Sequence, residues 1–185
     1  MTFWDHLDEL RGVIIKILIA IVVFMVISFL FKEEVFRIVL APKDSDFVLY
    51  QLLQKAATGI GITSFNLPSF EIELISTQLA SQFIIHMKTA LCCGLLLASP
   101  YILYQLLRFV TPALYESERR YAVPVVTWGY ILYIIGVLLN YIFIFPLAIR
   151  FLGTYQVSAD IPNLITLDSY ISTLITMSLL MGLMF

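Results

Sequence analysis

The chain has 185 residues, of which 61% are hydrophobic and 13% charged, and its formal net charge is −2. Soluble domains average about 25% charged residues, so this composition excludes a water-soluble fold. The charge balance also provides no basic patch for nucleic acid. We therefore expect an all-α membrane protein, built as a polytopic bundle of transmembrane helices.

Four apolar stretches predict the membrane spans. Each of the first three is long enough to cross a bilayer, which takes about 20 apolar residues. The fourth is shorter, and no polar or aromatic anchor follows Gly182–Phe185, so we expect the sequence to be a fragment of a longer protein. The expected spans are residues 13–31, 83–107, 123–149 and 170–185 of one membrane domain that covers residues 1–185.

The first polar segment, residues 3–16, shows the periodicity of an amphipathic helix. Its apolar and acidic residues fall on opposite faces, Phe3, Leu7, Leu10 and Ile14 against Asp5, Asp8 and Glu9. We expect this helix to lie at the membrane interface before the chain turns into the first span. Its acids have two open explanations, namely solvation with a local pair between Asp8 and Arg11, or ligand binding.

The number of spans sets which loops share a side of the membrane. The N-terminal tail and loop 109–120 fall on one side, and loops 32–82 and 151–167 on the other. Because Lys and Arg are split between the two sides, their distribution is a weak guide, and we place the N-terminus in the cytoplasm.

The long first loop predicts a cap of short helices outside the cytoplasm. Glu34–Leu40 and Phe47–Ala57 have apolar residues at helical spacing, with Ser45 as a candidate N-cap of the second helix. Thr58–Phe70 is rich in Gly, Asn and Pro and predicts an irregular connection. The sequence leaves open whether this cap binds a partner or only covers the bundle.

Three prolines mark predicted changes of direction. Pro100 follows Ser99 in the middle of the second span, where we expect a bend whose freed backbone groups neighbouring helices satisfy. Pro112 ends that helix on the cytoplasmic side. Pro146 can kink or stop the third span, which is long enough to be tilted.

The ionisable and amide side chains near the spans have ordinary structural explanations. Lys88, with His86, lies one turn inside the second span and can reach outward to the interface. Asp168 caps the fourth helix or meets its positive dipole end. Gln105 and Asn140 are candidates for packing between helices. Adjacent Cys92 and Cys93 point about 100° apart on a helix, which disfavours a disulfide or a metal site.

Loop 109–120 gathers Glu116, Glu118, Arg119 and Arg120 within five residues. Exposed acids beside arginines usually form local pairs that contribute little. Two carboxylates brought together from separate segments would act differently, because each fits the planar guanidinium of arginine in a bidentate fork that lysine cannot reproduce.

Four ordered motifs resemble the signatures of the TatC family, the polytopic subunit of twin-arginine translocase. They are His6-Leu-Asp-Glu-Leu-Arg11, Leu97-Ala-Ser-Pro-Tyr-Ile-Leu-Tyr-Gln105, Phe109-Val-Thr-Pro-Ala-Leu-Tyr-Glu-Ser-Glu-Arg119 and Phe145-Pro-Leu-Ala-Ile-Arg-Phe-Leu152. The resemblance implies six spans with cytoplasmic termini, of which four are present, in the bacterial inner membrane. It implies single-span translocase subunits, membrane lipid and further copies of itself as partners, and export of folded proteins driven by the proton-motive force.

The resemblance also assigns roles residue by residue. Glu9 and Glu118 match the carboxylates that bind the two arginines of the signal peptide, without a catalytic residue, metal or cofactor. The residues that would shape this site are Arg11, Phe109, Pro112, Leu114, Tyr115 and Arg119. The residues with structural or partner-contacting roles are Pro42, Lys88, Pro100, Gln105, Pro146 and Asp168.

Two departures from the family pattern stand out. Val13 stands where the family usually has a second basic residue. Lys16 could supply the missing positive charge instead. The family's acidic residue in the fourth helix falls after Phe185.

Two other classes of function compete with signal recognition. A secondary transporter or channel usually has charged groups or broken helices near the membrane midplane, and the central thirds of these spans hold essentially no ionisable group. An intramembrane enzyme is the third hypothesis, but the sequence contains no His-Glu-x-x-His motif, no Gly-x-Ser-x-Gly motif and no aspartate pair on facing spans.

Overall fold

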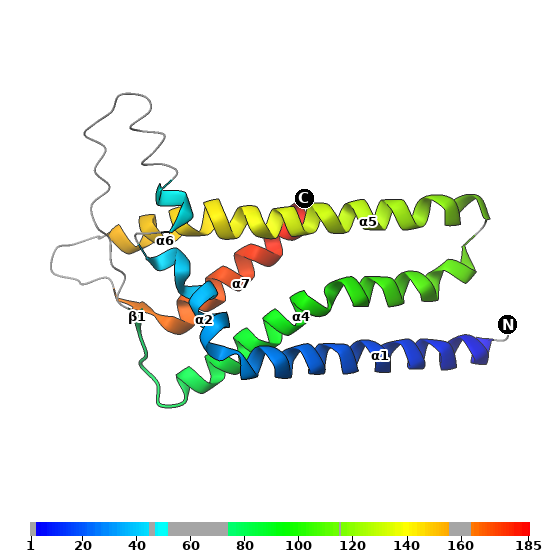
Figure 1. Ribbon diagram of the computed structural model, residues 1–185, viewed down its shortest axis with the longest axis horizontal. Helices are drawn as coiled ribbons and strands as arrows, with labels where there is room; N and C mark the ends of the chain where they lie inside the picture. The colour runs from blue at the N-terminus through cyan, green and yellow to red at the C-terminus, as the bar shows by residue number, and fades with distance from the viewer. Residues whose placement is uncertain (1–2, 45–46, 52–73, 115, 156–163) are drawn as a thin grey trace, which may run out of the picture. The chain divides into compact units, whose positions relative to one another are not determined.

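The computed structural model describes residues 3–44, 47–51, 74–114, 116–155 and 164–185, and only the backbone of residues 3–6, 113 and 116–119. The described elements in chain order are α1 (Phe3–Leu30), α2 (Lys32–Leu40), the 3₁₀ turn η1 (Ala41–Lys43), β1 (Leu74–Ile75), α4 (Ser81–Val110), the 3₁₀ turn η2 (Thr111–Ala113), α5 (Glu116–Leu139), the π-helical turn η3 (Asn140–Ile144), α6 (Phe145–Thr154), β2 (Ile165–Thr166) and α7 (Leu167–Met184) (Figure 1). Four helical segments are long and apolar enough to cross a membrane, Leu7–Leu30, Ser81–Val110, Arg120–Thr154 and Leu167–Met184. The predicted class, an all-α polytopic membrane protein, is confirmed.

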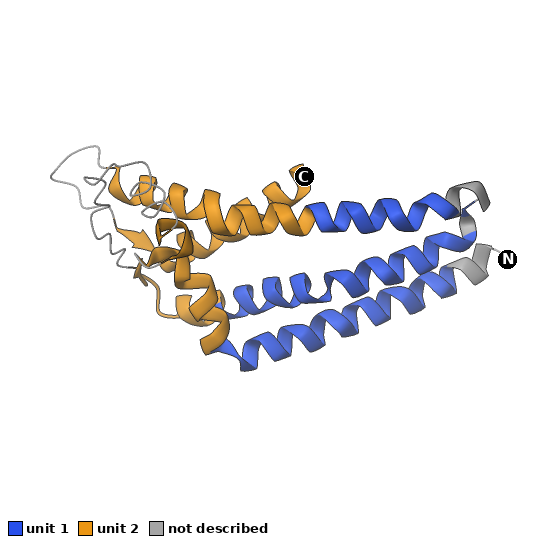
Figure 2. Cartoon of the chain, turned by 45° about the horizontal axis from the view of Figure 1, so that its top comes forward, with its two compact units in different colours: residues 1–32, 86–132 blue, residues 33–85, 133–185 orange. Residues whose placement is uncertain are grey.

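The chain divides into two compact units. Unit 1 comprises residues 1–32 and 86–132, and unit 2 comprises residues 33–85 and 133–185 (Figure 2). The helices α4 and α5 therefore each contribute residues to both units. Unit 1 holds long helices and the candidate site, whereas unit 2 holds the short helices of the first loop and the strand pair.

In unit 1, α1 and α4 run antiparallel and pack along one seam. Gly94 approaches the backbone of Met25 so closely that an added Cβ would lie 2.7 Å from the Met25 nitrogen. Nearer the other end of the seam, the rings of Phe29 and His86 stack with centroids 4.1 Å apart. Because glycine has no side chain, it allows the two backbones to meet, which is the usual way that helices pack in lipid.

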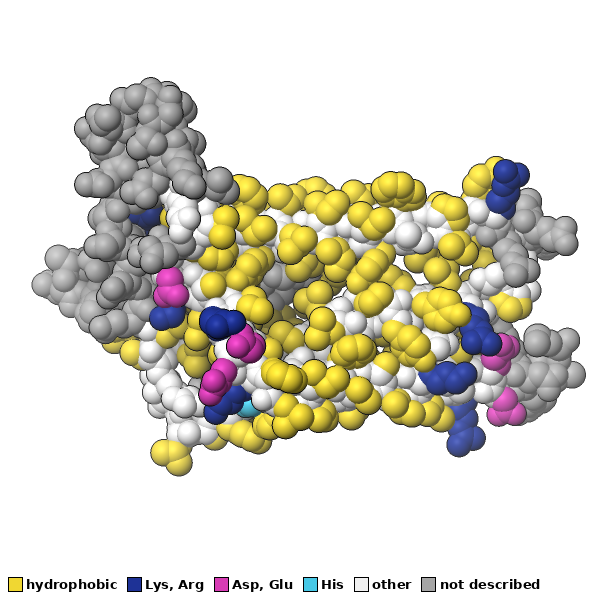
Figure 3. Space-filling model, viewed as in Figure 1, with side chains coloured by type: hydrophobic (Ala, Val, Ile, Leu, Met, Phe, Trp, Pro, Cys, Tyr) yellow, Lys and Arg dark blue, Asp and Glu magenta, His cyan; other side chains and the backbone are white. Residues whose placement is uncertain are grey.

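The face of the unit 1 helices that Figure 3 shows is largely apolar between their ends, as a lipid-facing surface requires. On α1, for example, Leu18, Ile19 and Val22 are each more than half exposed. Such a surface would be unfavourable in water, whereas lipid tails are as apolar as these side chains and solvate them.

Pro100 lies inside α4, and the helix continues through it. Proline has no N–H, so the carbonyl oxygen of Leu96, four residues earlier, loses its normal donor. The hydroxyl of Ser99 donates to that oxygen, and its Oγ also lies 2.9 Å from the hydroxyl of Tyr130 on α5. We predicted that neighbouring helices would satisfy the freed backbone groups; instead the same helix satisfies the carbonyl, and the neighbouring helix bonds to Ser99.

The third span also continues through its proline. The structure has helical residues on both sides of Pro146, which occupies the first turn of α6. The preceding turn η3 is π-helical, and the N–H of Phe145 bonds to the carbonyl of Asn140, five residues earlier. This wider turn makes room for the proline ring, which otherwise clashes with the preceding turn. The option that Pro146 stops the helix was therefore wrong.

Unit 2 is organised around the end of α2. The last four carbonyls of a helix have no partner within it. Two tyrosines supply partners here, since Tyr141 donates its hydroxyl to the carbonyl of Ile38, and Tyr170 donates to that of Val39 at 3.2 Å. The aromatic ring of Tyr170 also packs edge-on against Phe145, with centroids 5.0 Å apart. The core around these rings consists of Ile85, Phe145, Ile149, Tyr170, Ile171 and Leu174.

A short parallel strand pair joins the two loops of unit 2. The predicted all-α fold did not include these strands. Leu74 pairs with Ile165, and Ile75 pairs with Thr166. The sequence signal is weak, because two residues per strand give no measurable periodicity. The pair fixes the start of α7, whose N-cap is Thr166.

The predicted helices of the first loop are partly observed. The segment Glu34–Leu40 falls within α2, as expected. Residues 48–51 are helical, but residues 52–57, the candidate cap Ser45 and the connection Thr58–Phe70 lie outside the described residues.

Two glycines allow α5 and α7 to cross closely in unit 2. A Cβ on Gly136 would lie 2.7 Å from the carbonyl oxygen of Met181, and one on Gly182 would lie 2.6 Å from the ring of Tyr133. The first of these contacts is with backbone, which cannot move aside as a side chain can. Gly136 is therefore required by the crossing.

We predict that Gly136→Ala lowers stability by about 1–3 kcal/mol, because overpacking forces the two helices apart. The matched control is Gly129→Ala on the same helix, where an added Cβ meets nothing within 4 Å. That change should be neutral or stabilising by up to about 1 kcal/mol through helix propensity. Thermal unfolding in detergent measures both variants, and equal stability of the two would contradict the assignment of the crossing.

Candidate functional site

The N-terminal end of the candidate site is part of one straight helix. We predicted an interfacial helix followed by a turn into the first span, but α1 is uninterrupted from Phe3 to Leu30. Of the predicted apolar face, Leu7 and Ile14 are exposed, and the residue of this part of α1 that is buried is Val13. The turn was wrong because nothing in the sequence breaks the helix before Leu30.

Glu9 and Arg11 project from this part of α1 and are exposed. The predicted ion pair between Asp8 and Arg11 is not formed, and among the side chains that the structure describes Glu9 has no ion-pair partner. The Glu9 carboxylate therefore keeps its acceptor atoms available to a ligand. Val13, which stands where the resemblance implies a second basic residue, is buried.

The second part of the site follows α4. This helix ends at Val110, and η2 carries Pro112 in its first turn, so the prediction that Pro112 ends the helix is confirmed. The backbone N–H of Leu114 bonds to the carbonyl of Thr111 at 3.4 Å and turns the chain toward α5. Pro112 is exposed, whereas Phe109 and Leu114 are half-buried. Exposed and half-buried apolar groups thus lie side by side at this turn.

Three predicted site residues cannot be placed at the level of side chains. Tyr115 lies outside the described residues, as do the side chains of Glu118 and Arg119, although both of the latter are in the first turn of α5. Their roles remain those that the motif implies.

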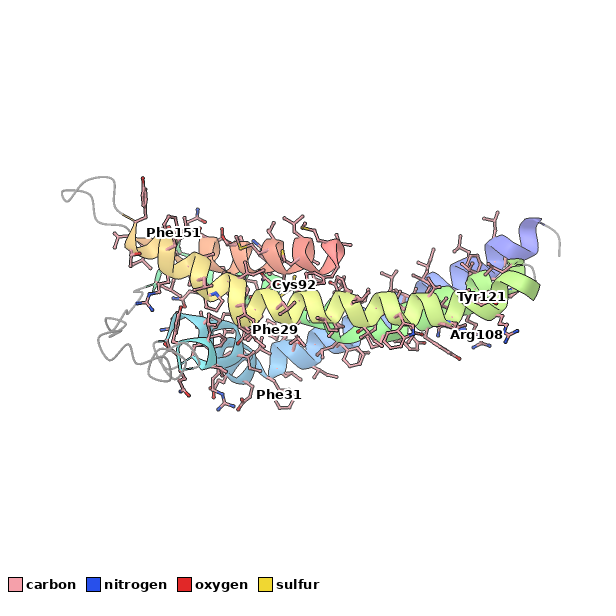
Figure 4. The ribbon with its side chains drawn as sticks, turned by 90° about the horizontal axis from the view of Figure 1, so that it is seen from above. Phe29, Phe31, Cys92, Arg108, Tyr121 and Phe151 are labelled. Atoms are coloured by element: carbon pink, nitrogen blue, oxygen red, sulfur yellow. The ribbon has the colours of Figure 1, made fainter. Side chains whose placement is uncertain are left out.

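Unit 1 brings the two parts of the site to one end. Outside the residues drawn in grey, the beginning of α1, the last turn of α4 and the beginning of α5 lie at this same end (Figure 2). Arg108, near the end of α4, and Tyr121, near the start of α5, lie at the same end (Figure 4). Acidic and basic side chains gather there, while the sides of the helices are apolar (Figure 3). Carboxylates and arginines thus meet where the membrane-spanning segments end.

The six residues predicted to be structural or partner-contacting have varied surroundings. Pro42 and Pro146 are fully buried in unit 2. Gln105 is buried and donates from Nε2 to the hydroxyl of Tyr101 at 2.7 Å, so it bonds within its own helix rather than between helices. Lys88 is half-buried. Pro100 is accommodated by Ser99, as described for α4.

Asp168 lies in the first turn of α7 but does not cap it. The N-cap is Thr166, whose side chain accepts from the backbone N–H of Ser169 at 3.2 Å. Asp168 accepts from the hydroxyl of Ser172 at 3.4 Å and lies at the positive end of the helix dipole. The second of the two predicted roles is therefore the one observed.

Asn140 behaves as predicted for a polar residue between helices. Its Nδ2 donates to Ser178 of α7 at 2.9 Å, and the side chain is fully buried. Within the described part of the chain, no group of three His, Cys, Asp or Glu residues is placed to hold a metal ion.

Sequence reasoning missed Tyr50, which ties the first loop to α6. Its hydroxyl donates to the carbonyl of Pro146 at 2.9 Å, and the guanidinium of Arg150 lies 5.5 Å from its ring centroid. Burial raises the pKa of the Tyr50 phenol, with Arg150 acting in the opposite direction, so the hydroxyl stays protonated and can donate. In the sequence, the only sign of this role was that Tyr50 is an aromatic residue among apolar neighbours in the first loop.

Comparison with known proteins supplies the family. The family model for Sec-independent protein translocase protein (TatC) matches residues 5–185. The TatC protein of Blattabacterium sp. subsp. Periplaneta americana is 32% identical, over 100% of this chain and 71% of the relative. TatC of Escherichia coli K12 is 31% identical, over 97% of this chain and 61% of the relative. TatC of Aquifex aeolicus is 32% identical, over 100% of this chain and 68% of the relative.

Solved structures agree with these relatives. A crystal structure of the twin arginine translocase receptor TatC in DDM superposes with a TM-score of 0.69 at 31% identity, over 96% of this chain and 70% of that one. A second crystal structure of this receptor gives a TM-score of 0.68 at 31% identity, over 96% and 68%.

Fold and relatives together define a multi-span α-helical membrane protein related to protein translocase subunits. The chain belongs to the TatC family of Sec-independent protein translocase proteins. It spans 61% to 71% of the length of the three relatives compared.

We predict that Tyr50→Phe lowers stability by about 1 kcal/mol, because the buried hydrogen bond to Pro146 is lost while the ring is retained. Tyr121→Phe is the matched control, since that side chain is 65% exposed. Its effect should stay within about 0.5 kcal/mol. Chemical or thermal unfolding of the detergent-solubilised protein compares the two. If Tyr50→Phe were as stable as the control, the hydrogen bond would not contribute to docking the loop.

Proposed function

We propose that this chain carries the surface on which a twin-arginine translocase reads the arginine pair of a signal peptide, with Glu9 and Glu118 as the two carboxylates. The observation that carries the proposal is the exposed Glu9, which has no ion-pair partner among the described side chains and lies in the same unit as the end of α4 and the start of α5. Glu118 is in the first turn of α5, which begins at that link.

The chemistry of the ligand follows from these groups. A carboxylate accepts two parallel N–H bonds from one guanidinium, so two glutamates match two consecutive arginines. Lysine offers a point charge instead of a planar fork and should bind more weakly. Phe109, Pro112 and Leu114 provide apolar surface beside the charged groups, and Arg11, Tyr115 and Arg119 would shape its rim.

The proposed topology places this surface in the cytoplasm of a bacterium, with the N-terminus cytoplasmic and the protein in the inner membrane. The cap formed by α2 and the strand pair then lies on the opposite side. We further propose that single-span translocase subunits, other copies of this chain and membrane lipid contact the exposed apolar faces of the spans. Folded proteins would be the cargo, with the proton-motive force as the energy source.

The binding test compares a twin-arginine signal peptide with the protein and its Glu9→Gln, Glu118→Gln double variant in detergent or nanodiscs. Glutamine keeps the size but loses the charge. Each lost charge-assisted pair costs about 1.5–3 kcal/mol, and 1.4 kcal/mol is a factor of ten. We predict that Kd rises at least about tenfold.

Two controls make this result specific. Glu33→Gln removes an exposed acid from α2, which the span count puts on the other side of the membrane, and should leave Kd unchanged. A Lys-Lys signal peptide should bind the unmodified protein more weakly than Arg-Arg. Equal binding of the Arg-Arg peptide by the protein and the double variant would rule out these two carboxylates.

The topology test introduces single cysteines at Glu9, Ser45, Glu118 and Ala159 in a background with Cys92→Ala and Cys93→Ala. We expect a membrane-impermeant thiol reagent added outside spheroplasts to label positions 45 and 159 only. Permeabilised membranes should label all four. External labelling of position 9 or 118 would refute the orientation, independently of the peptide-binding result.

A further inference from the structure

The seam between α1 and α4 contains two deeply buried hydroxyl groups. Ser28 on α1 is 4% exposed, and Thr89 on α4 is 3% exposed. Neither hydroxyl oxygen has a hydrogen-bond partner in the described part of the chain. A buried polar group without a partner is costly, and more so among lipid-facing helices where bulk water does not reach it.

The two hydroxyls lie between the same pair of helix contacts. On α1, Ser28 follows Met25 by one turn and directly precedes Phe29; on α4, Thr89 lies between His86 and Gly94. Met25 meets Gly94, and Phe29 stacks on His86 (Phe29 is labelled in Figure 4). Both buried side chains therefore lie in the same stretch of the α1–α4 seam, between these two contacts.

Other threonines of this chain satisfy their hydroxyls locally. Thr111, Thr127 and Thr154 each donate to the carbonyl four residues earlier in the same helix. This bond is the usual solution for a hydroxyl in a membrane helix. Thr89 and Ser28 do not use it, although both have such a carbonyl available. Within the described residues, the local bond that satisfies the other threonines is therefore not formed by these two hydroxyls.

We propose that Ser28 and Thr89 together bind one ordered water molecule in the α1–α4 seam. A hydroxyl offers one donor and two acceptor sites, so a water between the two groups can exchange hydrogen bonds with both. Buried waters characteristically bridge polar groups that the protein leaves unsatisfied. The surroundings are the stacked rings of Phe29 and His86, with the buried Nε2 atom of His86, and the buried Ala90 on α4.

The bound water connects α1 to α4 near the end of the seam opposite Glu9. Helices in lipid gain little from apolar contact with each other, since lipid tails are equally apolar, and polar contacts then set their register. The water site thus fixes how far α1 slides along α4. This inference is independent of the proposed peptide-binding surface.

A double-mutant cycle on the full chain tests the shared water. Thr89→Val and Ser28→Ala each remove one hydroxyl with little change of volume. Each should lower the thermal midpoint by roughly 2–4 °C, the shift that corresponds to losing one net buried hydrogen bond in a chain of this size. The double variant should lose less than the sum, because removal of both hydroxyls leaves no orphaned group.

Thr127→Val is the matched control, since its hydroxyl is exposed and bonded within α5. Thr89→Ser keeps the hydroxyl and should retain the coupling with Ser28. If Thr89→Val raises the midpoint, the hydroxyl is unsatisfied in the native protein and the proposal is overturned. Strictly additive losses would overturn it as well, because two separate sites do not share a water.

A direct measurement covers the case in which a variant does not fold. Water-edited solid-state NMR of the unmodified protein in lipid bilayers should show rapid magnetisation transfer from water to the methyl group of Thr89. The methyl groups of Ala90 and Ala98, which are equally buried, should receive it slowly. Equally slow transfer to Thr89 would exclude the water.

Discussion

The constraint on which this structure depends is that each backbone hydrogen-bond group in an apolar surrounding needs a partner within the protein. The second and third spans meet it by different means at Pro100 and at Pro146. In α4 the hydroxyl of Ser99 takes the place of the N–H that Pro100 lacks. Before Pro146 the chain widens into a π turn and keeps its bonds by changing their spacing. Neither helix ends at its proline, because in lipid an unsatisfied carbonyl costs more than a local distortion.

The same constraint explains why the short helices of the first loop attach where they do. A short helix leaves a large share of its carbonyls without partners, and α2 has nine residues. The hydroxyls of Tyr141 and Tyr170 reach its last turn from the spans, while Tyr50 reaches from the loop to α6. These tyrosines combine an apolar ring, which packs in the core, with one donor, which satisfies a carbonyl. The cap of unit 2 is thus held by groups that belong to the membrane helices.

The candidate site illustrates the opposite situation, since it lies where water is available and no internal partner is required. Glu9 and Arg11 are exposed, Glu9 has no ion-pair partner among the side chains that the structure describes, and Pro112 follows the end of α4 in an exposed turn. Recognition of an arginine pair by the proposed site would then rest on the geometry of the carboxylates rather than on burial.

The sequence by itself determined the class, the four apolar segments, the end of α4 at Pro112 and the family, because these depend on composition, local periodicity and ordered motifs. Only the tertiary structure decided that α1 runs straight past Lys16, that Val13 is buried and Ile14 exposed, and that Thr166 rather than Asp168 caps α7. These depend on which face of a helix meets a neighbour, and an all-apolar stretch carries no such information. The strand pair and the tyrosine hydrogen bonds were likewise unpredictable, since their partners lie about 90 to 130 residues apart in the sequence.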